Sequence, residues 1–174
     1  MLRVTEIVPA GHWEKKRMKD EVTLDYEERH RRRRAYTGAW GTEFLLDMAE
    51  TVVLRDGDGL KLEDGSIIAV RAAKEQVVEI SAHSAHELVR LAWHLGNRHL
   101  PTQIDGQRLF IRDDHVIVDM LKGLGAHVRH VSVPFDPEGG AYGQQNHDHR
   151  HPHAHSHAHD DHHHGHDRDH HHDH

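Results

Sequence analysis

The stretch SAHELVRLAWHLGNRHLPTQ, residues 84–103, decides the fold of the second half of the chain. Its first four residues have the S-x-x-E pattern of a capping box at a helix start. Apolar residues then recur at the three- and four-residue spacing of one helix face: Leu88, Leu91, Ala92 and Leu95. Gly96 follows the last of them, at the place of a left-handed C-cap. The pattern predicts an amphipathic helix that ends at Gly96.

Strands are predicted on both sides of this helix. They cover QVVEIS (76–81), a short extended segment near 102–104, RLFIR (108–112) and HVRHVSVPF (127–135). A second helix has the same apolar spacing, with Asp113 or Asp114 as its cap and Gly125 after its end. The order β-α-β-β-α-β predicts a ferredoxin-like domain over residues 75–142.

Residues 1–74 lack helical periodicity and are typical of a small all-β domain. Their short runs rich in β-forming residues are EVTLDY (21–26), TEFLLDM (42–48), TVVL (51–54) and SIIAV (66–70). Turn residues separate these runs, as in RDGDG (55–59). Several short strands at close spacing predict a sandwich or a barrel. The whole chain is therefore expected to be an α+β protein with two domains.

The segment from 147 to 174 is built almost entirely from histidine and aspartate. It holds fifteen histidines, six aspartates and two arginines. The formal net charge is −7 for the whole chain and −3 for residues 1–146. Residues 143–174 cannot bury enough apolar surface to offset their ordering entropy, so they predict a disordered tail. Neutral imidazole suits nickel, copper and zinc. The predicted tail ligands are His147, His149, His151, His153, His155, His157, His159, His162, His163, His164, His166, His170, His171, His172 and His174.

Two other interpretations of the tail are weaker. Expression tags are uninterrupted histidine runs, whereas this segment interleaves aspartate, alanine, serine, proline and arginine. A solubilising or pH-sensing role is also open, because histidine titrates between about pH 5 and 8. Metal binding is the favoured interpretation. With no geometry imposed before binding, such a tail is expected to hold several ions weakly.

Composition excludes several function classes. The chain has no cysteine, so a thiolate zinc site, a disulfide framework and a thiol nucleophile are absent. No apolar run reaches eighteen residues, and the N-terminus lacks the apolar segment of a signal peptide. A soluble cytoplasmic protein with no membrane partner is expected. No H-E-x-x-H motif or general base beside a three-ligand set occurs, so an enzyme is not expected.

The run EERHRRRRAY (27–36) is a candidate phosphate-binding patch. However, the body of the chain is acidic overall and no aromatic-interleaved RNA motif accompanies the arginines. A solvated strand edge or an acidic protein partner is the favoured interpretation. No nucleic-acid partner is expected.

The segment HLGNRHLPTQ (94–103) places one histidine on a short, stiff loop. The predicted helix ends at Gly96, and Pro101 restricts Leu100 to an extended conformation. The imidazole of His99 is therefore a candidate metal ligand. A basic residue at a helix end also commonly hydrogen-bonds the freed carbonyl groups. Local spacing leaves both interpretations of His99 open.

His115 is the second candidate ligand outside the tail. It lies in the first turn of the second predicted helix, where the helix dipole disfavours a protonated ring and keeps a lone pair available. A surface histidine at a helix start is an equally good interpretation of the local sequence.

Three segments in order carry a family resemblance: LGNRHLPTQ, then DHVIVDMLKGLGAHV, then PFDPEGGAY, followed by the His-rich end. Together they resemble the UreE family, the nickel metallochaperones of urease maturation. The resemblance is dense over residues 94–142 and weaker over 1–75, where TLDYEERHRRR is similar to a threonine- and arginine-rich strand of the family. In the tail it rests on composition alone.

The resemblance implies a first domain like the peptide-binding module of a chaperone, for contact with a protein partner, and a second domain that binds metal and dimerises. His99 matches the family histidine at the dimer interface, where two copies share one nickel ion. His115 matches a further surface ligand. The family's second surface histidine falls at Asp113, so the chain departs from the pattern there.

The function predicted on this basis is delivery of Ni(II) to apo-urease by a cytoplasmic homodimer. The His99 pair would be the delivery site, and the tail a recruitment reservoir. The implied partners are the urease accessory GTPase and the apo-urease maturation complex. Zn(II) and Cu(II) are possible competing ions, because copper lies above nickel in the stability order of divalent metals. The alternative is a general nickel or zinc storage or buffering protein.

Overall fold

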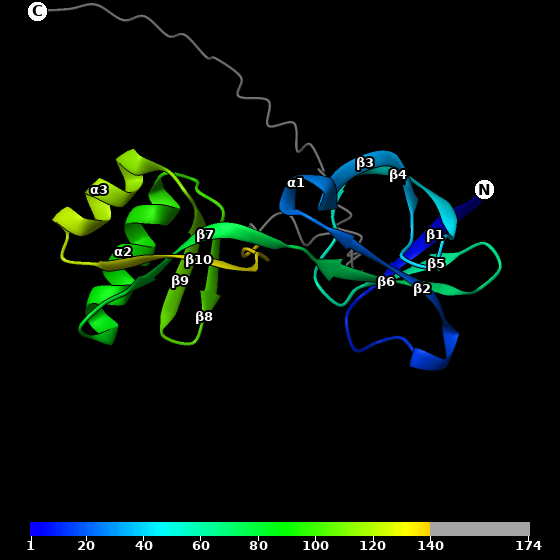
Figure 1. The fold of residues 1–174 in the computed structure, drawn as a ribbon, viewed down its shortest axis with the longest axis horizontal. Coiled ribbons are helices and arrows are strands. Elements are labelled where there is room, and N and C mark those ends of the chain that lie inside the picture. Colours follow the sequence, from blue (N-terminus) through cyan, green and yellow to red (C-terminus); the bar gives the residue numbers. More distant parts are fainter. Residues whose placement is uncertain (140–174) are drawn as a thin grey trace, which may run out of the picture. The chain divides into compact units, whose positions relative to one another are not determined.

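The computed structural model describes residues 1–139 of the chain, which contain a six-stranded and a four-stranded β-sheet (Figure 1). The predicted tail and its fifteen histidines lie outside the described residues. Within residues 1–139, no helix has the length and apolar composition that crossing a bilayer requires.

A six-stranded sheet fills the first half of the chain, in the strand order β2-β6-β5-β1-β4-β3. Its strands are β1 (Leu2–Val8), β2 (Met18–Leu24), β3 (His30–Thr37), β4 (Glu43–Val53), β5 (Gly59–Leu62) and β6 (Ile67–Ala72). A 3-10 turn, η1 (Lys15–Arg17), and a one-turn helix, α1 (Tyr26–Arg29), precede β2 and β3. Side chains such as Phe44, Leu46 and Leu60 are fully buried in its core. The strand-rich first half is confirmed, but the predicted all-β domain did not include α1.

Two strands of this sheet were missed, and one was wrongly divided. The sequence pattern predicts no strand at β1 or β5, and it predicts separate strands over 42–48 and 51–54, where β4 is continuous. The pairing of β3 with β4 explains the division. Arg31 pairs with Val52 and Arg33 with Asp47, so the register shifts between them. Such a bulge interrupts the alternation of apolar and polar residues without ending the strand.

Strand β3 carries the arginine run at the end of the sheet order. Arg32, Arg33 and Arg34 are exposed. Arg33 lies 3.8 Å from Asp47, and Arg34 lies 3.4 Å from Glu28. The arginines therefore line a solvated edge strand and are partly neutralised by neighbouring carboxylates.

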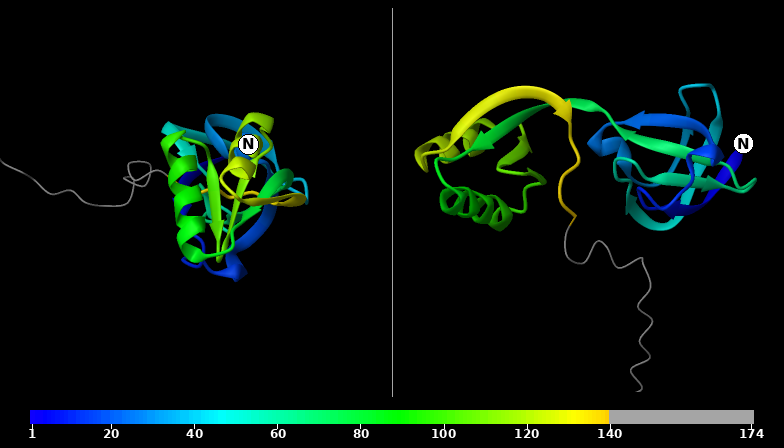
Figure 2. Two further views of the ribbon diagram at one scale, coloured as in Figure 1. Left: turned by 90° about the vertical axis from the view of Figure 1, so that its left-hand side faces the viewer. Right: turned by 90° about the horizontal axis from the view of Figure 1, so that it is seen from below.

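The second half has the predicted element order β-α-β-β-α-β. It contains β7 (Lys74–Ser81), α2 (Ala85–Asn97), β8 (Thr102–Asp105), β9 (Arg108–Arg112), α3 (His115–Gly123) and β10 (His127–Pro134). The strand order is β10-β7-β9-β8, and every neighbouring pair is antiparallel. Figures 1 and 2 show both helices on the same side of this sheet. Their apolar stripes meet its inner face in one buried cluster, which includes Leu91, Leu95, Ile111 and Leu121.

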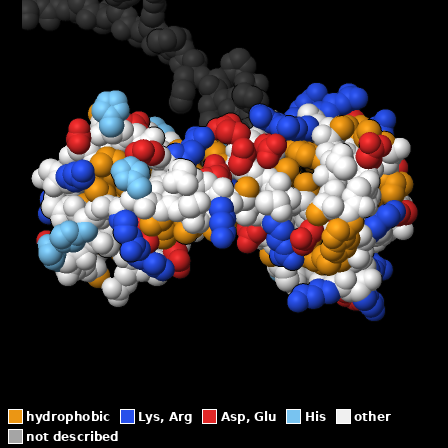
Figure 3. All heavy atoms as spheres, in the orientation of Figure 1, with side chains coloured by type: hydrophobic (Ala, Val, Ile, Leu, Met, Phe, Trp, Pro, Cys, Tyr) orange, Lys and Arg blue, Asp and Glu red, His pale blue; other side chains and the backbone are white. Residues whose placement is uncertain are grey.

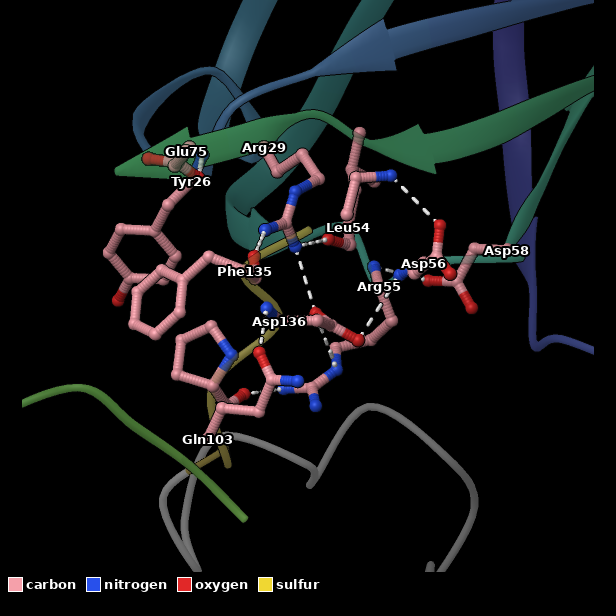
Figure 4. Close-up of polar contacts among 12 residues, drawn as sticks. Tyr26, Arg29, Leu54, Arg55, Asp56, Asp58, Glu75, Gln103, Phe135 and Asp136 are labelled. Carbon is pink, nitrogen blue, oxygen red and sulfur yellow. Dashed lines mark hydrogen bonds and ion pairs between the residues drawn. The ribbon is translucent and has the colours of Figure 1, made fainter. Parts of the chain in front are cut away.

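A buried arginine holds the segment that follows β10 (Figure 4). The side chain of Arg29 is fully buried, and its Nη1 donates to the Leu54 carbonyl at 3.0 Å and to Asp136 Oδ1 at 2.9 Å. Its Nη2 donates to the carbonyl of Phe135. Because an unpaired buried charge is very unfavourable, these contacts fix where the chain leaves β10.

Candidate metal centre

Helix α2 ends one residue later than the sequence predicted, and His99 takes the special backbone position. Gly96 lies inside the helix, Arg98 is the C-cap, and His99 has φ 54°. Of residues 1–139, His99 is the only residue other than glycine with a positive φ. The prediction that Gly96 forms the left-handed cap is therefore wrong, because the helix continues through Asn97 before it reverses.

The loop that carries His99 has the hydrogen bonds of a Schellman motif. The N–H of Leu100 donates to the Leu95 carbonyl at 3.4 Å, and the N–H of His99 donates to the Gly96 carbonyl at 3.0 Å. Leu100 also packs against the cluster that contains Leu95, which is the apolar contact typical of the motif. Pro101 follows directly and restricts the backbone of Leu100. The backbone of His99 is thus restricted by the end of α2 before it and by Leu100 and Pro101 after it.

The carbonyl groups at the end of α2 are satisfied by groups other than the His99 ring. Arg98 Nη1 donates to the His94 carbonyl at 3.2 Å, and backbone N–H groups take the carbonyls of Leu95 and Gly96. Among residues 1–139, the imidazole of His99 makes no hydrogen bond, and the residue is exposed. Its ring nitrogens are therefore available to an ion, and capping by the His99 ring is not observed.

Helix α2 also has an apolar outer face. Val89 is 67% exposed and Trp93 is 63% exposed, and the two residues are one helical turn apart. The indole of Trp93 contacts the ring of His94 edge-on, with centroids 5.1 Å apart. Large apolar side chains that face solvent on one stripe are typical of a surface for another protein.

At the start of α3, Asp114 and not Asp113 is the N-cap. Its Oδ1 accepts from the N–H of Val116 at 3.0 Å and from that of Ile117 at 3.2 Å. His115 is the first residue of the helix and is exposed.

The carboxylate of Asp113 contacts a histidine from another strand, His130 of β10. The distance from Asp113 Oδ2 to His130 Nε2 is 3.2 Å. The structure thus pairs Asp113 with His130. In the described part of the chain, no three or more His, Asp and Glu side chains gather as a metal-binding group. Ligation by His115 stays a prediction.

Sequence reasoning missed one pair of histidines. His83 and His127 are 44 residues apart, yet their Nε2 atoms lie 3.0 Å from each other. Antiparallel pairing of β7 with β10 brings them together, since His127 is opposite Ser81. The available signal was a histidine just beyond the end of one strand and another at the start of its partner, but the strand pairing was needed to read it.

Two family models match the chain. The model described as UreE urease accessory protein, N-terminal domain, matches residues 4–73, and the one described as UreE urease accessory protein, C-terminal domain, matches residues 75–160. Similar proteins carry the name urease accessory protein UreE. The one from Bradyrhizobium sp. (strain ORS 278) is 56% identical over 149 residues, which cover 86% of this chain and 70% of that protein.

Relatives of more similar length give the same result. The protein from Beijerinckia indica subsp. indica is 49% identical over 152 residues, covering 86% of this chain and 87% of the relative. The protein from Rhodobacter capsulatus is 47% identical over 152 residues, covering 86% and 94%. Both carry the name urease accessory protein UreE.

Proposed function

Because the chain belongs to the UreE family of urease accessory proteins, we propose that it is a nickel metallochaperone that delivers Ni(II) to apo-urease during assembly of its metallocentre. The observation that supports this most is the state of His99. A positive φ places it on a stiff loop, and its exposed ring is not engaged by any of residues 1–139. The chain is a carrier and not an enzyme.

The delivery site consists of His99 from two copies of the chain. One imidazole cannot hold a labile divalent ion tightly. A two-fold axis brings the same histidine of a second copy to the ion, so the site has two imidazole ligands. The outer face of α2 supports a homodimer, because Val89 and Trp93 expose apolar surface on the helix that precedes His99. Aromatic residues are enriched at such interfaces.

Two imidazole ligands leave coordination positions open. Water, tail histidines or an accepting protein can occupy them, which lets the ion be transferred by exchange of one ligand at a time. A closed set of four protein ligands would be typical of a structural site instead. The fifteen tail histidines act as the recruitment reservoir. Zn(II) and Cu(II) compete for the same ligands, because imidazole binds all three ions.

The domain roles follow the same proposal. Residues 1–74 contact a protein partner, residues 75–142 form a ferredoxin-like domain that binds metal and dimerises, and residues 143–174 are the metal-binding tail. The antiparallel order β10-β7-β9-β8 with two helices on one face supports the ferredoxin-like assignment. The partners in the cytoplasm are the urease accessory GTPase and the apo-urease maturation complex. The exposed arginines of β3 favour a partner with an acidic surface for the first domain.

A nickel titration tests the proposal. We compare the full chain with a version that ends at Tyr142, by calorimetry with Ni(II). Truncation should remove several weak tail sites and leave the shared site, which accounts for one ion per dimer because it takes one ligand from each copy. His99→Ala in the truncated chain should lower the stoichiometry by this one ion per dimer. His86→Ala is the matched control, since His86 is another exposed histidine of α2.

Two outcomes would contradict the assignment. An unchanged stoichiometry in His99→Ala would exclude His99 as the delivery ligand. Full urease activation by the full-length His99→Ala protein would favour the storage alternative, in which the tail alone carries the function.

A further inference from the structure

We propose that His83 and His127 form a second divalent-metal site on each chain, separate from the His99 site. Their Nε2 atoms are 3.0 Å apart, and the two ring planes are close to perpendicular, at 81°, with centroids 4.6 Å apart. Both residues are exposed, so an ion from solution can reach them. Figure 3 shows histidine side chains exposed at several separate places on the surface of this half of the molecule.

The fold fixes both backbones at this place. His127 is the first residue of β10 and pairs with Ser81, the last residue of β7. His83 follows two residues later, immediately before Ser84, whose side chain accepts a hydrogen bond from the N–H of Glu87 at 3.2 Å and caps α2. Pairing of β10 with β7 therefore fixes the backbone of His127, and the start of α2 fixes that of His83. This pre-organises the pair for a ligand.

The separation of the two nitrogens matches two ligands of one metal ion. Metal–imidazole bonds are about 2.0–2.1 Å long, so two nitrogens at a right angle on one ion lie roughly 2.8–3.0 Å apart. Octahedral Ni(II) and tetragonal Cu(II) have such adjacent positions, and Zn(II) can be bound after a small opening of the pair. Calcium and magnesium prefer oxygen ligands and are not expected.

Binding requires one tautomer change and no net loss of a proton. In the hydrogen-bonded pair of neutral rings, one Nε2 carries a hydrogen and the other accepts it. When the ion binds, that hydrogen leaves the donor Nε2, and the same ring takes up a hydrogen at Nδ1 through water. Both Nε2 lone pairs then face the ion.

The site is independent of His99. His83 precedes the first residue of α2, and His99 follows its last residue, with thirteen helical residues between them. A helix of this length spans roughly 20 Å, so one ion cannot bridge the two sites. The inference therefore does not depend on the proposed function. Its stoichiometry also differs, because a site within one chain adds one ion per chain and a shared site adds one per two chains.

The coordination sphere of the new site is incomplete. No third His, Asp or Glu side chain joins the pair within residues 1–139. Water fills the remaining positions, and the ion is expected to exchange readily. The competing interpretation is a plain hydrogen bond between two surface rings, which would contribute little to stability at an exposed position.

A calorimetric titration separates the two interpretations. The protein is the full-length chain with all fifteen tail histidines replaced by Gln, titrated with Ni(II) and, separately, with Cu(II). We expect about one ion per chain beyond the ion that His99 accounts for, as two protein ligands in one chain predict. His83→Gln or His127→Gln should each remove this ion, and His99→Ala should leave it in place. His86→Gln, three residues from His83, is the matched control and should change nothing.

Unchanged stoichiometry in both His83→Gln and His127→Gln would overturn the inference. A second measurement uses the unaltered full-length chain, crystallised with Cu(II) and examined by anomalous diffraction. The expected peak lies about 2.0–2.1 Å from the Nε2 atoms of both rings. Rings that stay hydrogen-bonded to each other, with no peak between them at saturating copper, would also overturn it.

Discussion

Helices α2 and α3 end in the same hydrogen-bonded motif but with different residues at its left-handed position. At the end of α3, the N–H of Ala126 donates to the Leu121 carbonyl and that of Gly125 to the Lys122 carbonyl, both at 3.0 Å. Gly125 has φ 86°, whereas the equivalent residue of α2 is His99 with φ 54°. Glycine adopts this conformation freely, and a residue with a Cβ is strained in it.

The difference indicates what each helix end does. Gly125 is the residue that folding alone would favour at such a position. His99 departs from this preference in a loop that is otherwise held by the same bonds and the same apolar contact. A histidine tolerated there at some expense of stability is typical of a position used for binding. The comparison therefore supports the metal role proposed for His99 on grounds separate from the family.

The largest effect should come from the apolar residue that anchors each motif. Leu95 and Leu121 are both fully buried and accept the longer-range bond of their motifs. Leu95→Ala and Leu121→Ala should each lower the free energy of unfolding by about 2–5 kcal/mol, because each leaves a cavity. Urea denaturation measures both. A loss below about 1 kcal/mol at either position would mean that the helix end is not anchored as described.

Gly125→Ala should lower the free energy of unfolding by about 1–2 kcal/mol. A Cβ built at Gly125 meets no atom within 4 Å, so the whole effect is the conformational strain of a positive φ. Thermal unfolding compared with the parent protein measures it. No change in the midpoint would contradict the assignment of Gly125 as the left-handed residue.

Gly96→Ala should have the opposite sign. Gly96 lies inside α2, and a Cβ there also meets nothing within 4 Å. Alanine should therefore raise the free energy of unfolding by roughly 0.5–1 kcal/mol, through its better helix propensity. If Gly96 were the left-handed cap, as its sequence position suggested, the same substitution would destabilise. The sign alone decides between the two.

His99→Gly should change stability as little as Gly96→Ala does. Removing the Cβ from a left-handed residue should raise the free energy of unfolding by roughly 0.5–1 kcal/mol, because histidine tolerates this region better than most residues. His99→Ala, which keeps the Cβ, is the control and should be near neutral. A clear destabilisation by His99→Gly would show that the ring stabilises the loop, and would remove the argument that its position serves binding.

Much of the second half could be predicted from local patterns. The apolar stripe of α2, the N-cap before α3 and the turn at Gly125 each depend on a few neighbouring residues in the sequence. The end of α2 was misplaced because Gly96 has the sequence signal of a left-handed cap, whereas the apolar contact of Leu100 with the core favours the left-handed residue at His99. That contact depends on tertiary packing, which the local pattern does not contain.

The candidate site divides in the same way. His99 was predicted as a metal ligand from its loop and the family resemblance, and this role stays a prediction. Its left-handed φ was not predicted. The contact of Asp113 with His130, and that of His83 with His127, join residues far apart in sequence. Strand pairing creates both contacts, so the local spacing of residues could not predict them. In the first half, a bulge opposite Arg31 hid the continuity of β4 for a similar reason.

The most direct test of the central claim is anomalous diffraction from crystals of the full-length protein grown with Ni(II). The account predicts one nickel peak on a two-fold axis, about 2.0–2.1 Å from an imidazole nitrogen of His99 in each of two copies. Nickel bound elsewhere, with the two His99 rings far apart in every assembly of the crystal, would contradict it.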